Sequence, residues 1–140
     1  MTIRWSQLGW LIPRQRWLLV PFYGFLFVAG LIALGHPSAA VSMSASPLFT
    51  WVWAGFYVVG GFTCTVGALF KSLWGEAAGL PLIASASAIY GTAVLLTYSD
   101  REDAAYLVVG LLLMSQALGL FDRWLGVMSL LSRVRELGTD

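Results

Sequence analysis

The sequence is poor in charge. Only 11% of its 140 residues are charged, whereas 59% are hydrophobic, and a typical soluble domain carries about 25% charged residues. The charged residues gather in short clusters, and long stretches between the clusters carry no charge at all. Because a helix of roughly 20 apolar residues crosses a bilayer, this distribution predicts a polytopic membrane protein.

Cysteine and histidine each occur once. Cys64 lies in an apolar stretch, cannot form a disulfide within the chain, and is interpreted as a small packing residue. His36 has no second histidine to complete a metal site. No nucleophile elbow, glycine-rich phosphate loop or zinc motif occurs either. We therefore expect no metal, no cofactor, no nucleic-acid partner and no enzymatic activity.

Apolar stretches at residues 17–34, 48–70, 77–98 and 104–121 are predicted to be membrane-spanning helices. They are continuously apolar and lack the period of two that barrel strands need. The expected fold is an all-α, integral-membrane four-helix bundle, with residues 1–140 forming one domain. Short amphipathic helices are expected on its flanks, at about residues 3–12 and at about residues 123–137, where the fourth span is expected to continue into the amphipathic helix.

The basic residues predict the orientation of the helices. If the N-terminus lies inside, all but one of the 8 lysines and arginines fall on the inner side, and only Arg101 falls on the outer side. Such a bias follows the positive-inside rule. Both termini are therefore expected in the cytoplasm, and the protein in the inner (cytoplasmic) membrane of the cell.

Lys71 and Glu76 interrupt the apolar sequence between the second and third stretches, and two interpretations stay open. In the structural one they form a solvated inner turn, where an ion pair contributes about 0–1 kcal/mol. Glu76 and Pro81 then lie in the first turns of the next helix, and Glu76→Gln would change little. In the functional one, Glu76 faces a cavity as a gate or proton site.

No ionisable residue lies in the middle of an apolar stretch. Because ion-coupled transporters mark their paths with such residues, this absence argues against ion-coupled transport. Gln116 is the remaining candidate polar or gating residue at depth. A small-solute channel is a weaker alternative, and it would need a water-filled path lined by Gln116, Thr63 and Thr65.

Small residues recur at four-residue spacing along the predicted helices, which lets helix backbones approach closely. The candidate helix-packing residues are Ala29, Ala33, Gly60, Cys64, Ala68, Ala84, Ala88, Ser115 and Gly119. Two interpretations are open for these rows. They either pack the four helices of one chain or face further copies and other membrane proteins.

The segment "GALFKSLWGEAAGLPLIASASAIYGTAVL", residues 67–95, together with the chain length and the four stretches, resembles small four-span membrane proteins of actinobacterial phages. Members of that group are largely uncharacterised or described as holin-like. The resemblance implies a protein that oligomerises and permeabilises the host membrane, or acts there in another way, with lipid and further copies as partners. The alternative is a scaffold or accessory subunit of a larger membrane complex.

Overall fold

The computed structural model describes residues 16–36, 47–101 and 104–137. Within these ranges the chain forms four helices, α2 (Arg16–Gly35), α4 (Pro47–Leu69), α5 (Leu73–Arg101) and α6 (Ala104–Leu137). Each is long and apolar enough to cross a membrane, which indicates a multi-pass membrane protein. The prediction of an all-α chain with four membrane-length helices is confirmed.

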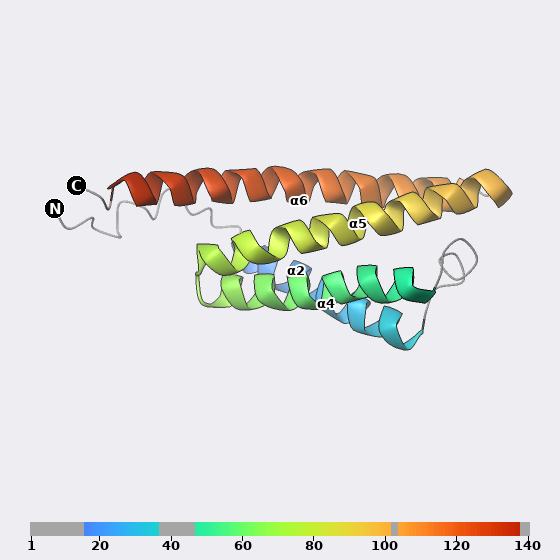
Figure 1. Ribbon diagram of the computed structural model, residues 1–140, viewed down its shortest axis with the longest axis horizontal. Coiled ribbons are helices and arrows are strands. Elements are labelled where there is room, and N and C mark those ends of the chain that lie inside the picture. Colours follow the sequence, from blue (N-terminus) through green and yellow to red (C-terminus); the bar gives the residue numbers. More distant parts are fainter. Residues whose placement is uncertain (1–15, 37–46, 102–103, 138–140) are drawn as a thin grey trace.

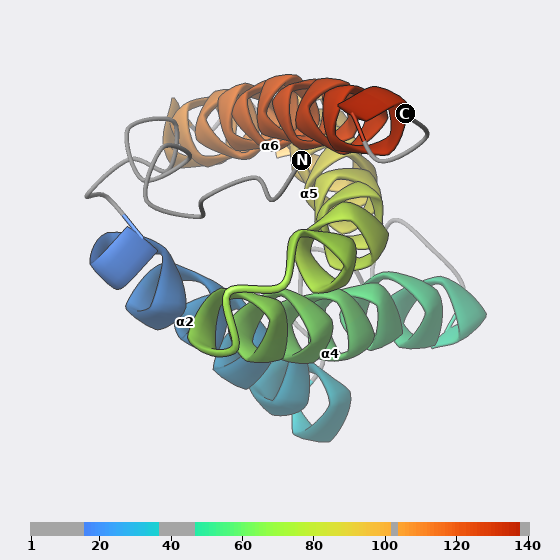
Figure 2. The same cartoon turned by 90° about the vertical axis from the view of Figure 1, so that its left-hand side faces the viewer.

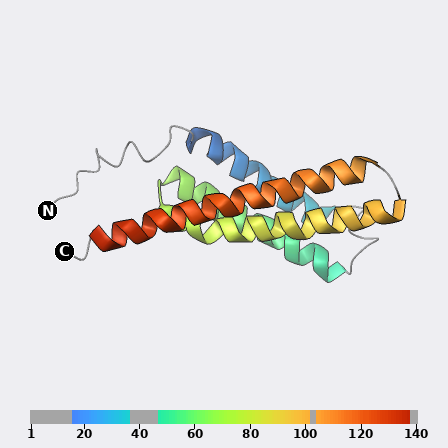
Figure 3. The ribbon, with the colours of Figure 1, turned by 90° about the horizontal axis from the view of Figure 1, so that it is seen from above.

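The helices pack in the order of the chain. α2 packs on α4, α4 on α5, and α5 on α6. Figure 2 shows the result end-on: α2 and α6 lie at the two ends of a row, with α4 and α5 between them. Seen from above, α5 and α6 run side by side over most of their length (Figure 3). The arrangement is therefore a row of helices rather than a closed bundle.

The last two helices are longer than the predicted spans. α5 begins four residues before its predicted start and contains Pro81 inside the helix, so the prediction that Pro81 lies in the first turns is wrong. Residues 123–137, expected to continue the fourth span as an amphipathic helix, are part of α6, which extends beyond the α4–α5 turn (Figure 1). The other predicted flank, residues 3–12, lies outside the described residues.

The α4–α5 turn is closed by a left-handed residue. Lys71 has φ 56°, and the N–H of Ser72 donates to the carbonyl of Gly67 at 2.8 Å while that of Lys71 donates to Ala68 at 3.4 Å. This is the Schellman pattern, in which the last carbonyls of a helix accept from the residues beyond it. The Ser72 Oγ then accepts from the N–H of Gly75 at 3.4 Å and caps α5.

Glycines allow α4 and α5 to approach closely beyond this turn. A Cβ added at Gly67 would lie 2.8 Å from the backbone nitrogen of Glu76, and one added at Gly79 would lie 2.7 Å from the carbonyl oxygen of Gly60. No side chain fits at these separations. The close contact continues from the turn into the apolar part of the hairpin, so it fixes where the first turn of α5 lies against α4.

Aromatic side chains pack the other half of the α4–α5 contact. Trp53 stacks on Tyr90 with ring centroids 4.5 Å apart and meets Tyr57 edge-on at 5.8 Å. The Tyr57 hydroxyl lies 2.8 Å from Ser87 Oγ, which itself donates to the carbonyl of Ile83. The two hydroxyl groups thus find partners inside the protein, as buried hydroxyl groups require, whereas Trp53 Nε1 is buried without a hydrogen-bond partner among the described residues.

Candidate functional site

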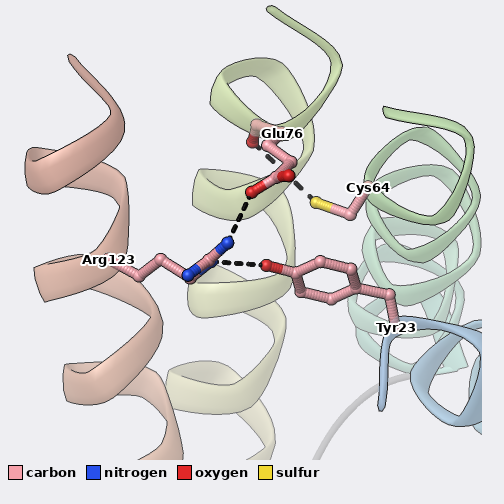
Figure 4. Close-up of polar contacts among 4 residues, drawn as sticks. All are labelled: Tyr23, Cys64, Glu76 and Arg123. Carbon is pink, nitrogen blue, oxygen red and sulfur yellow. Dashed lines mark hydrogen bonds and ion pairs between the residues drawn. The ribbon is translucent and has the colours of Figure 1, made fainter. Parts of the chain in front are cut away.

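Side chains from all four helices converge near the α4–α5 turn. Tyr23 of α2, Cys64 of α4, Glu76 of α5 and Arg123 of α6 point toward one another (Figure 4). Arg123 Nη2 lies 2.7 Å from Glu76 Oε2, and Arg123 Nε donates to the Tyr23 hydroxyl at 2.8 Å. Cys64 Sγ lies 3.9 Å from the backbone oxygen of Glu76. We call these four residues the junction cluster.

Glu76 is fully buried, with 0% exposure, so the interpretation of Lys71 and Glu76 as a solvated ion-paired turn is wrong. Gly67 and Gly75 explain the burial, because without side chains at these positions the backbone of the first turn of α5 contacts that of α4. Lys71 is exposed at the turn. The carboxylate takes its cation from Arg123, a residue 47 positions away in sequence.

The ion pair is held in place by a hydrogen bond that depends on Pro81. A proline in a helix has no N–H to donate to the carbonyl four residues earlier, so Pro81 leaves the Ala77 carbonyl without its helical donor. Trp124 Nε1 of α6 donates to that carbonyl at 3.1 Å. Adjacent residues of α6, Arg123 and Trp124, therefore bind adjacent residues of α5, Glu76 and Ala77.

The Tyr23 hydroxyl connects α2 to α6, which do not otherwise pack along their lengths. Tyr23→Phe keeps the ring and removes the acceptor of Arg123 Nε. We expect the free energy of unfolding to fall by about 1–3 kcal/mol, measured by denaturant unfolding in micelles. Tyr106→Phe, in α6 at a half-buried position, is the control. An equal loss in both variants would show that the bond to Arg123 is unimportant.

The structure divides the candidate helix-packing residues into two groups. The buried or half-buried ones are Ala33, Gly60, Cys64, Ala68, Ala84 and Ala88. Gly60 is in close contact, since an added Cβ would lie 2.8 Å from Ile83 Cγ1. Ala29, Ser115 and Gly119 are exposed, and a Cβ at Gly119 would meet nothing within 4 Å.

The candidate polar residues at depth do not gather. Thr63 and Thr65 donate to carbonyls of their own helix, at 2.6 and 2.7 Å. Gln116 is half-buried, and its Nε2 is buried without a hydrogen bond in the part of the chain that the structure describes. His36 is exposed just after α2. Among the described residues, no group of three or more metal-ligating side chains occurs.

The sequence pattern predicts a role for Arg123 only in the orientation of the chain and on the polar side of the C-terminal helix, and it does not single out Tyr23. A usable signal was present for Arg123. Glu76 comes one residue before the third apolar stretch, and Arg123 two residues after the fourth. Successive antiparallel spans place these two positions at the same membrane depth, so opposite charges there are natural partners. Tyr23 carries no comparable signal, because an aromatic residue in an apolar stretch is common.

The junction cluster can fix the arrangement of α2, α5 and α6 and hold a charge pair close to one membrane surface. No protein-family model, no curated protein and no solved structure matches this chain. The four membrane-length helices indicate the class, a small multi-pass α-helical membrane protein.

Proposed function

We propose that this protein acts without catalysis, as a small membrane protein that assembles with further copies of itself. The observation that supports the proposal is the row of helices. Among the described residues, α2 packs along α4 and α6 along α5, but α2 and α6 do not pack along each other, so this part of the structure leaves a face at each end of the row open to another chain. Membrane helices associate through close packing rather than through hydrophobic burial, and a free helix face is therefore the first requirement.

α6 offers a suitable face. Ser115 and Gly119 lie four residues apart and are both exposed, and Gly119 has open space where a Cβ would stand. Elsewhere the chain uses such positions internally, as at Gly60 and Gly79. Pairs of small residues at this spacing let two helices meet closely. The proposed contact is therefore made by α6 of neighbouring copies at Ser115 and Gly119.

Gly119→Leu should weaken self-association and leave the fold of the single chain intact, because a Cβ at Gly119 meets nothing within 4 Å in the described part of the chain. A side chain that does not fit costs about 1–3 kcal/mol, which corresponds to roughly 5- to 150-fold weaker association. Analytical ultracentrifugation in matched-density detergent measures it. Gly55→Leu, at another glycine with open space, is the control. Unchanged association of the Gly119 variant would remove this face from the proposal.

We also propose that both termini and the junction cluster lie on the cytoplasmic side of the inner membrane, which the distribution of lysine and arginine supports. A cysteine-reactive label in a Cys64→Ala, Ser44→Cys variant should then react from outside the cell. Ser44 lies outside the described residues, in the connection between α2 and α4. Labelling of Ser44→Cys only after the cell is opened would reverse the orientation.

The biological result that we propose for assembly is permeabilisation of the membrane in the manner of holins, which the resemblance of residues 67–95 to phage membrane proteins implies. Controlled expression in bacteria, with membrane potential as the readout, tests it. Loss of potential that also requires an intact Gly119 face supports the proposal. Full potential at high membrane levels, with a second protein co-purifying in fixed ratio, would favour an accessory subunit instead.

A further inference from the structure

One turn of α6 carries an acidic and a basic residue together with two exposed glycines. Asp122 and Arg123 are adjacent, with Asp122 exposed and the Arg123 side chain 29% exposed. Gly119 lies three residues before Asp122 and four before Arg123. Gly126 lies four residues after Asp122 and three after Arg123. Residues at these spacings are neighbours on a helix surface. The four positions therefore form one diamond-shaped patch, which we call the α6 patch.

The α6 patch presents a cation although Arg123 is ion-paired. Glu76, its partner, has 0% exposure whereas the Arg123 side chain is 29% exposed, so Arg123 is the member of the pair that reaches the surface. Arginine has five N–H donors. The bonds to Tyr23 and Glu76 use two of them, and three are left for an acceptor outside the chain. Near a membrane surface the abundant strong acceptor is a lipid phosphate.

The glycines make room for such a group. A Cβ at Gly119 or at Gly126 would meet nothing within 4 Å, so the helix surface between the two charged side chains is uncovered backbone. The patch lies at the depth of the α4–α5 turn, because Arg123 reaches Glu76 in the first turn of α5. Exposed Trp74 and Phe70 occur at that turn, as aromatic residues do at headgroup depth.

We infer that the α6 patch binds the headgroup of a zwitterionic aminophospholipid from the adjacent leaflet. The phosphate accepts hydrogen bonds from Arg123, and the primary ammonium group pairs with the carboxylate of Asp122. The opposite charges of the headgroup match the two charges of the patch, and neither an anionic lipid without an amine nor a free anion does so. Gly119 also belongs to the face proposed for self-association, so a bound headgroup and a neighbouring copy compete there, and the lipid is expected on the single chain.

Native mass spectrometry of the detergent-released chain, read on the single-chain peak, tests the inference. The probes are phosphatidylethanolamine and phosphatidylglycerol with matched acyl chains, and inorganic phosphate alone. A charge-assisted hydrogen bond contributes about ten- to hundredfold in affinity. We therefore expect the wild type to bind phosphatidylethanolamine at least about tenfold more tightly than phosphatidylglycerol.

Asp122→Asn should abolish this preference, and Arg123→Lys should weaken binding of both lipids. Arg133→Gln, at an exposed arginine further along α6, should change neither. Because Asp122 is exposed, its variant tests the inference even if Arg123 variants fold poorly. A wild type without preference, an Asp122→Asn variant that keeps it, displacement of lipid by inorganic phosphate, or lipid bound only to dimers would each overturn the inference.

Discussion

Replacing Arg123 by leucine is expected to lower the free energy of unfolding by about 3–5 kcal/mol, the range found when one partner of a buried ion pair is removed. The variant removes the Arg123 cation from Glu76, which has 0% exposure. It also leaves the Tyr23 hydroxyl without the donor that joins α2 to α6. Denaturant unfolding in micelles, followed by tryptophan fluorescence, measures the change.

The matched control is Arg133→Leu, which removes an exposed arginine from the same helix and should change stability little. The double variant Glu76→Gln, Arg123→Leu removes the charge from both partners and should recover part of the loss, since an uncharged pair costs less to bury. Glu76→Gln alone, harmless if Glu76 were solvated, should also destabilise. A double variant as unstable as Arg123→Leu would contradict the importance of the pair.

Replacing Gly79 by leucine is expected to prevent α5 from docking on α4. A Cβ at this position would lie 2.6 Å from Cys64 Sγ, 2.7 Å from the Gly60 oxygen and 3.0 Å from the Cys64 nitrogen. Two of these atoms are backbone, so α4 as a whole would have to move. Gly79→Ala should already cost about 1–3 kcal/mol, and Gly79→Leu should give no monodisperse protein in size-exclusion chromatography.

Gly55→Ala is the control for Gly79→Ala, because a Cβ at Gly55 meets nothing within 4 Å. There the change should be neutral or stabilise α4 by up to about 1 kcal/mol through helix propensity. Equal stability of the Gly79→Ala and Gly55→Ala variants would show that the close contact of α4 with α5 does not hold the hairpin together. The difference in the free energy of unfolding between Gly79→Ala and Gly55→Ala, rather than either value alone, decides the result.

Membrane-length helices were predictable because the bilayer imposes one length and one polarity on every span. The continuation of the fourth span into residues 123–137 was predictable from their helical periodicity. The start of α5 was not, because the apolar stretch begins at Ala77 while the helix begins at Leu73. Pro81 misled the prediction for the same reason. It is tolerated inside α5 because Trp124 Nε1 takes the carbonyl that it leaves free, and this is a tertiary contact that no local pattern contains.

The candidate site was predictable only in part. Glu76 was singled out because charge is scarce, yet its solvated interpretation failed, since burial depends on how closely Gly67 and Gly75 bring two backbones together. Small residues at four-residue spacing mark possible contacts without telling which are used. Gly60 and Gly119 have the same pattern in sequence, but only Gly60 is packed against a neighbour in the described chain.

The most direct test of the proposed function is the mass of the wild-type assembly, extracted from the membrane with its surrounding lipid in a polymer nanodisc. The chain has a mass of 15.2 kDa, and self-assembly through α6 predicts integral multiples of that mass, reduced toward single chains by Gly119→Leu. A population of single chains in wild-type membranes, or a complex dominated by a different protein, would contradict the proposal.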